Sequence, residues 1–227
     1  MEIDGGFGLV EGDGGTQCIT QFVDHGSIES HRYYLSRRTV LEMLRDRGYD
    51  VADSELAGSL TQFRAEFGDK PELQRLRISV SLRTNPYKKM LVIFMGTEDI
   101  KKATIRCVLA QIVNRESLNG LMLILQSKMN HHARKEMAKF PSKVEIFQIT
   151  DLLMNITKHV IVPRHEILTI QQKEQLLNKY KAEDKQLPRM LETDAIARYY
   201  RLEKGQVVKI TYSGGLVDSL DTYRCVT

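Results

Sequence analysis

The segment between residues 76 and 147 restricts the fold more than any other feature, because strand patterns alternate there with helical ones. Residues 76–82 alternate apolar and polar side chains, as does a strand with one buried face. Residues 91–94 and 121–125 are apolar without interruption, which is typical of strands covered on both faces. Further patterns are two helical ones and a last strand, at 105–112, 133–139 and 144–147. This order predicts an α/β domain with a mixed, partly parallel sheet.

Two helices are expected before this sheet. The first begins at the N-cap residue Ser27 and ends at Gly48, and the second follows Asp53 and ends at Gly68. Asn85-Pro86 predicts a hairpin turn between the first two strands. One face of the first helix is rich in arginine, accompanied by three acids, and we interpret it as a solvated surface rather than a phosphate contact. Its arginines are Arg32, Arg37, Arg38, Arg45 and Arg47.

A second, smaller α+β unit is predicted after residue 150. Thr169 and Gln172 form a capping box for a helix that should turn Leu176, Leu177 and Tyr180 inward. Asp194 caps a short helix. Two strands follow at 207–212 and 222–226, with a turn beginning at 213–215. A unit of this size gains stability from a partner that covers its apolar face.

The chain is therefore expected to divide into three parts: an acidic, glycine-rich flexible leader (1–26), an α/β domain (27–150) and an α+β domain (151–227). The leader has five acids and neither Lys nor Arg, whereas 27–150 carries 21 basic residues against 14 acidic ones. Such an excess is compatible with a place near nucleic acid, although scattered solvated charge produces the same excess.

Catalytic, metal and cofactor motifs are missing from the sequence. There is no G-x-S-x-G elbow, no phosphate-binding loop, and no His or Cys spacing that suits a metal. The three cysteines are far apart, which favours a reducing compartment, and no apolar run is long enough to cross a membrane. We expect no cofactor and no catalysis by the chain alone. Because catalytic residues can be dispersed, a free-standing DNA-processing enzyme stays a remote alternative.

One family resemblance is dense and specific over about 40 residues. The segments that carry the resemblance are Gln186-Leu187-Pro188-Arg189, Asp194-Ala195-Ile196-Ala197-Arg198-Tyr199-Tyr200, Lys204-Gly205-Gln206-Val207-Val208-Lys209-Ile210 and Tyr223-Arg224. Together they resemble the fifth subunit of eukaryotic nuclear RNA polymerases, a module that archaeal polymerases also carry. The match extends upstream through Asn155-Ile156-Thr157 and Arg45-Asp46-Arg47-Gly48-Tyr49.

The resemblance implies a nuclear, non-catalytic subunit without homo-oligomerisation. Its α/β domain would form part of a jaw near downstream duplex DNA, and its C-terminal assembly domain would dock on the largest polymerase subunit. Nucleotidyl transfer would be carried by the largest subunits. The side chains expected to dock are Leu187, Pro188, Arg189, Arg198, Tyr199, Tyr200 and Arg224. Ordinary packing is an equal alternative for Tyr199 and Tyr200.

Departures from the family pattern point to one polymerase. The Thr-Pro-Ser-Ala loop that approaches DNA in the family is replaced by Asn130-His131-His132-Ala133, so the DNA-proximal candidates become Lys128, Asn130, His131 and Arg134. Arg201 replaces a glycine, at a loss of roughly 1 kcal/mol if its φ is positive. With Ala195 and the changed 213–219 turn, these features resemble the plant version in RNA polymerase V, whose noncoding transcripts guide DNA methylation. The alternative is the general subunit shared by polymerases I, II and III.

Overall fold

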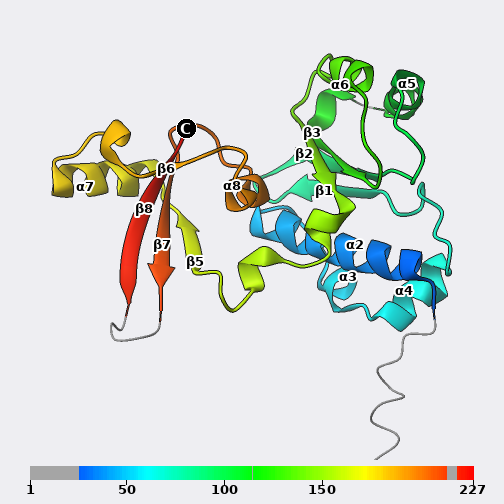
Figure 1. The fold of residues 1–227 in the computed structure, drawn as a ribbon, viewed down its shortest axis with the longest axis horizontal. Coiled ribbons are helices and arrows are strands. Elements are labelled where there is room, and N and C mark those ends of the chain that lie inside the picture. Colours follow the sequence, from blue (N-terminus) through cyan, green and yellow to red (C-terminus); the bar gives the residue numbers. More distant parts are fainter. Residues whose placement is uncertain (1–25, 114, 214–218) are drawn as a thin grey trace, which may run out of the picture.

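The chain folds around two separate four-stranded sheets, each with its own helices (Figure 1). The structure is a computed structural model that describes residues 26–113, 115–213 and 219–227. The strand orders are β1-β2-β3-β4 and β5-β7-β8-β6. We call the first sheet with its helices the first unit, and the second sheet with its helices the second unit. This architecture confirms the predicted fold class, an α/β unit with a mixed sheet followed by a smaller α+β unit.

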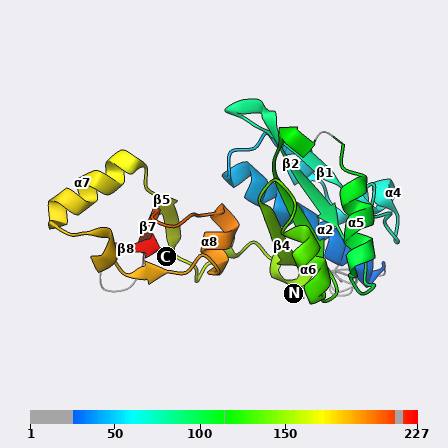
Figure 2. The same ribbon diagram turned by 90° about the horizontal axis from the view of Figure 1, so that it is seen from above.

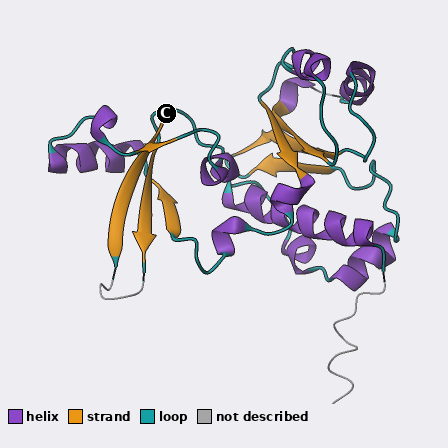
Figure 3. Cartoon of the chain, viewed as in Figure 1, coloured by secondary structure: helices purple, strands orange, loops and turns teal. Residues whose placement is uncertain are grey.

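The first sheet contains one antiparallel and two parallel pairings. Strand β1 (Ile78–Leu82) runs antiparallel to β2 (Asn85–Phe94), whereas β3 (Leu118–Leu125) is parallel to both β2 and β4 (Val144–Gln148). The strands and helices follow one another along the chain as predicted, and β1 and β2 form the expected hairpin. Figure 3 shows this sheet between two groups of helices.

Helices cover both faces of the first sheet. On one face lie α2 (Ile28–Asp46), α3 (Asp53–Ala57) and α4 (Leu60–Phe67), and on the other lie α5 (Lys102–Ala110) and α6 (His131–Met137) (Figure 1). Successive residues of β3 point to opposite faces, so Met122 packs toward α2 while Leu123 joins the cluster that contains α5 and α6. Burial on both faces explains why this strand is apolar throughout.

The first helix has the predicted ends, but the second helix is interrupted. The Ser27 hydroxyl accepts from the Ser30 N–H at 3.2 Å, and Gly48 takes a φ of +86°, open to glycine without strain. The expected helix from Asp53 to Gly68 breaks between α3 and α4, where Ser59 forms a capping box with Gln62. The expectation of one continuous helix was wrong because a local cap competes with the apolar spacing.

The second unit consists of a short mixed sheet and two helices. Its strands are β5 (Arg164–Ile167), β6 (Arg189–Met190), β7 (Val207–Tyr212) and β8 (Leu220–Val226), and its helices are α7 (Ile170–Tyr180) and α8 (Ala195–Tyr200). Thr169 and Asp194 cap α7 and α8 as predicted. Tyr180 was expected to turn inward but is 59% exposed. Short 3₁₀ helices complete the chain: η1 (Arg115–Ser117), η2 (Ile149–Leu152), η3 (Ile156–Lys158) and η4 (Asp184–Gln186).

Two sequence predictions concern parts of the chain that lie outside the described residues. They are the acidic leader, apart from Gly26, and most of the turn at 213–219. Within the described residues, none of the helices is both long enough and apolar enough to span a membrane.

Candidate docking and nucleic-acid surfaces

The four DNA-proximal candidates lie together at the carboxyl end of β3. Lys128, Asn130, His131 and Arg134 are all exposed, on the loop after the strand and the first turn of α6. The Asn130 side chain is the N-cap of this helix, and its Oδ1 accepts from the Ala133 N–H at 2.8 Å. The amide nitrogen of Asn130 is then the part of this side chain that can donate to an external acceptor. Contact with DNA at this loop stays a prediction.

The docking candidates at the other end of the chain surround the edge of the second sheet. Leu187 is half-buried against Leu176 and Val207, while Pro188 and Arg189 are exposed. The Pro188 carbonyl accepts from the Cys225 N–H at 2.8 Å, which holds the start of β6 against β8. Two further docking candidates, Tyr200 and Arg224, are partly buried.

Arg198 and Tyr199, expected to dock on a partner, make their contacts within the chain. The Arg198 guanidinium donates from Nη2 to the Ile146 carbonyl at 2.6 Å and lies 4.3 Å from the centre of the Phe147 ring. Tyr199 is only 3% exposed, and its hydroxyl donates to Asp46 Oδ2 at 2.7 Å. These side chains join α8 to the first unit, so a docking surface would consist of the exposed members of the set.

Arg47 is the centre of the joint between α8 and the first unit, although its arginine-rich helix face was expected to be solvated. Its side chain is 3% exposed and forms a two-pronged ion pair with Glu145 of β4. Its Nε and Nη2 also donate to the Tyr199 and Arg198 carbonyls, both at 2.8 Å. Arg47 therefore neutralises a buried carboxylate and caps the carboxyl end of α8, two tasks that suit a planar guanidinium.

Arg201 adds a second cation to the same carboxylate. Its Nε lies 3.2 Å from Glu145 Oε1, and its Nη2 donates to the Asn119 carbonyl at 3.2 Å. The residue has a φ of +56°, in the left-handed region that side chains rarely adopt. Arg201 therefore has the positive φ at which the replacement of a glycine is expected to cost roughly 1 kcal/mol. Arg47 had no local sequence signal for this role, because its partners are 98 to 152 residues away.

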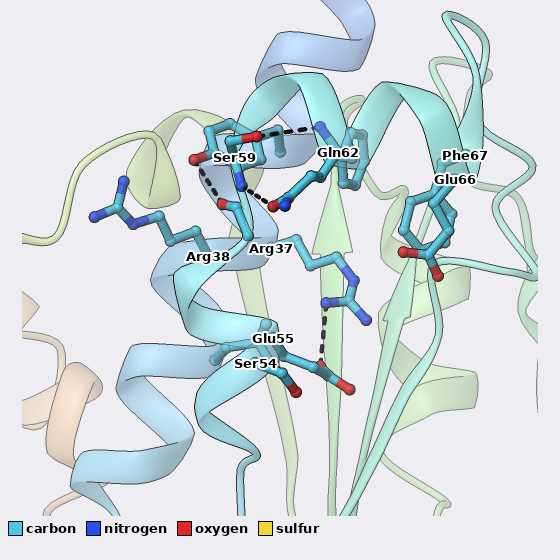
Figure 4. Close-up of a pocket in the computed structure, with 12 residues that line it drawn as sticks. Arg37, Arg38, Ser54, Glu55, Ser59, Gln62, Glu66 and Phe67 are labelled. Atoms are coloured by element: carbon cyan, nitrogen blue, oxygen red, sulfur yellow. Dashed lines mark hydrogen bonds and ion pairs between the residues drawn. The ribbon is translucent and has the colours of Figure 1, made fainter.

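A cavity of about 330 Å³ lies between α2, α3 and α4 (Figure 4). Arg37 donates from Nη1 to Glu55 at 3.2 Å, and its guanidinium lies 5.6 Å from the Phe67 ring centre. The Arg37 side chain is 15% exposed, so the expected solvated face was wrong here too. Its lining includes three aromatic side chains, Tyr34, Phe63 and Phe67, and the ion pair between Arg37 and Glu55. The lining residues labelled in Figure 4 are Arg37, Arg38, Ser54, Glu55, Ser59, Gln62, Glu66 and Phe67.

Comparison with known proteins places the chain in a family. Residues 27–112 match the family model for the N-terminal domain of RNA polymerase Rpb5, and 154–226 match the model for its C-terminal domain. Across the described residues, no cluster of three or more His, Cys, Asp or Glu side chains is arranged to hold a metal ion.

Full-length relatives agree with these matches. DNA-directed RNA polymerase V subunit 5C of Arabidopsis thaliana is 55% identical over 94% of this chain and 92% of the relative. Subunit 5A of the same polymerase and organism is 50% identical, over 92% of this chain and 94% of the relative. A subunit of RNA polymerases I, II and III from Caenorhabditis elegans, RPABC1, is 34% identical over 88% of this chain and 97% of the relative. The two family models, the identity over nearly the whole chain and the two-unit fold together show that the chain belongs to the Rpb5 family of RNA polymerase subunits.

Proposed function

We propose that the chain is a non-catalytic subunit of RNA polymerase V in a plant nucleus, where it serves noncoding transcription for RNA-directed DNA methylation and gene silencing. The observation that carries the proposal is the 55% identity, over 94% of the chain, to a protein named as a subunit of that polymerase. Nucleotidyl transfer belongs to the largest subunits of such an enzyme, and this chain contributes structure.

The second unit docks on the largest subunit through the exposed edge around β6. Pro188 and Arg189 are exposed there, and Leu187 and Arg224 are partly buried beside them. Arginine is a favoured interface side chain because it combines a charged fork with an apolar stem. The joint at Arg47 and Glu145 then fixes the first unit relative to the docked one. In this arrangement the loop with Lys128, Asn130, His131 and Arg134 approaches the downstream duplex.

Purification of the tagged chain from plant nuclei, followed by mass spectrometry of the co-purified largest subunits, tests the proposal. We expect the largest subunit of RNA polymerase V. An Arg189→Glu variant should lower its recovery, whereas Lys179→Glu, a charge reversal on exposed α7, should not. Equal recovery with both variants would remove the β6 edge from the interface.

The alternative is the general subunit shared by polymerases I, II and III, favoured by the 34% identity to RPABC1 of Caenorhabditis elegans. The same purification separates the two functions. Recovery of the largest subunits of polymerases I, II and III alike would overturn the specialised assignment.

A further inference from the structure

The tip of the β1–β2 hairpin, residues 83–89, which we call the β1–β2 turn, includes three residues of β2 that lie outside the regular ladder. Ser81 pairs with Lys89, but the next residue of β1, Leu82, pairs with Asn85. Residues 86–88 are therefore looped out of the ladder, and a bulge of this kind turns side chains away from the sheet. Figure 2 shows the β1–β2 turn extending beyond the body of the first unit. The Tyr87 N–H donates to Asn85 Oδ1 at 3.1 Å, which fixes the start of the loop.

Tyr87, in the middle of this loop, is 85% exposed. Its neighbours Pro86, Lys88 and Lys89 are also exposed. An exposed aromatic ring with cations beside it has the composition of a platform on which a base can stack.

The same turn carries three cations. Arg83, Lys88 and Lys89 are exposed, and no acid occurs between residues 83 and 89. In the part of the chain that the structure describes, none of the three has an ion pair within 4.0 Å. The adjoining acids are Asp50, whose N–H donates to the Ser81 carbonyl, and Glu116 in η1. The turn has an excess of positive charge that an anionic partner would neutralise.

We propose that the β1–β2 turn binds single-stranded nucleic acid, with Tyr87 stacking on an unpaired base and Arg83, Lys88 and Lys89 contacting the phosphates on either side. Aromatic stacking combined with flanking cations is how proteins hold single strands without regard to sequence. A base pair inside a duplex offers its face only after the stack is opened, which costs a few kcal/mol per step, so the ring favours a single strand.

This contact is separate from the loop with Lys128 and Asn130. The turn adjoins the amino end of β3, since Lys89 pairs with Leu118, whereas the Asn130 loop follows the carboxyl end at Leu125. At about 3.3 Å per residue, the eight-residue strand separates the two sites by roughly 23 Å. Variants at one site therefore serve as controls for the other.

A fluorescence titration of the full chain tests the proposal, because the protein contains no tryptophan. In Tyr87→Trp, the single tryptophan should be quenched on addition of oligo(dT) or oligo(U), and less by a blunt duplex of equal length. The two oligomers distinguish DNA from RNA as the preferred strand. Tyr180→Trp, at a tyrosine 59% exposed on α7, is the matched control and should show no saturable quenching.

Binding variants give the decisive outcomes. Measured by anisotropy of a labelled oligomer, Tyr87→Ala should weaken binding by about 5- to 100-fold, because one base can no longer stack. Lys88→Ala with Lys89→Ala should reduce the slope of log affinity against log salt by about 0.7 for each phosphate that is no longer neutralised. No binding by the wild-type chain, equal or stronger binding of the duplex, or loss of binding only in Lys128 and Arg134 variants would each overturn the proposal.

Discussion

The guanidinium of Arg47 and the carboxylate of Glu145 meet in a two-pronged pair, with 3.1 Å from Nη1 to Oε1 and 2.8 Å from Nη2 to Oε2. Both groups are nearly enclosed, with side chains 3% and 12% exposed. Arg201 of the second unit approaches the same carboxylate, so Glu145 receives one arginine from each unit. The joint between the units thus depends on a buried charge that is compensated from both sides.

Replacement of Arg47 by Met should lower the free energy of unfolding by about 3 kcal/mol, because Glu145 loses its main partner and two α8 carbonyls lose their donors. Urea denaturation followed by circular dichroism measures the change. Arg45→Met is the matched control: its partner Asp53 is 97% exposed, so less than about 1 kcal/mol is expected. Equal losses would mean that the buried pair contributes no more than a surface one.

Substitutions at Arg201 should separate backbone strain from side-chain interactions. Arg201→Ala removes the Glu145 and Asn119 interactions and keeps the φ of +56°, whereas Arg201→Gly removes the same interactions and relieves the strain. The glycine variant should be more stable than the alanine variant by about 1 kcal/mol. Thermal or urea unfolding of the two proteins provides the comparison. Identical stabilities would show that the left-handed conformation is not held in solution.

Removal of the Ser59 hydroxyl should destabilise α4. Ser59 accepts from the Gln62 N–H at 3.2 Å while the Gln62 side chain accepts from the Ser59 N–H at 2.8 Å. Ser59→Ala should lower the free energy of unfolding by about 1 kcal/mol, and Ser54→Ala, a residue without a capping contact on the same cavity, should change it little. Amide hydrogen exchange should locate the effect in 60–67; an effect spread evenly over the first unit would contradict a local cap.

Stability should fall in acid partly through Glu42. Burial alone would raise the pKa of this carboxyl, but hydrogen bonds from Lys158 and Asn155 outweigh it and lower the pKa below the ordinary 4.5. A lowered pKa contributes stability that is present above the unfolded value and lost as pH falls through the folded one. Glu42→Gln should therefore flatten the decline in urea midpoint below about pH 4.5. If the urea midpoint of Glu42→Gln declined as steeply as that of the wild type, the loss of stability in acid would come from other carboxyl groups.

Charge reversal at the Asn130 loop should change duplex binding in a salt-dependent way. If Lys128 and Arg134 contact phosphates, Lys128→Glu with Arg134→Glu should reduce the salt slope of duplex affinity by about 2. Anisotropy titrations of the assembled polymerase on a downstream duplex, at several salt concentrations, measure the slope. A paired reversal at Lys179 and Lys181, exposed lysines at the end of α7, controls for net charge. An unchanged salt slope in the Lys128 and Arg134 variant would show that this loop does not contact the DNA phosphates.

Features that depend on nearby residues could be predicted from the sequence. The caps at Ser27, Thr169 and Asp194 need only the next turn of their own helix, and each forms as expected. The apolar run in β3 also predicted a buried strand, because a strand that is covered on both faces is apolar at every position. The alternation of strand and helix patterns likewise predicted the parallel pairings, because a helix between two strands is the usual crossover of a parallel pair.

Features that depend on distant partners could not be predicted. Strand β6 has only two residues and exists because β8 lies beside it. Tyr180 has the spacing of a core residue, yet it is largely exposed near the end of α7. Arg47 and Arg37 share a charge-rich pattern with truly exposed arginines, and only the fold distinguishes those that meet a buried carboxylate or an aromatic ring. The composition of a helix face cannot report such pairings.

The hydrogen bond from Arg198 to the Ile146 carbonyl has a consequence for the open edge of the first sheet. Strand β4 is the outer strand of its sheet, and an outer strand offers backbone groups on which another chain can grow. The arginine occupies one of these groups at the middle of the strand. The edge therefore offers one acceptor fewer to a strand of another chain.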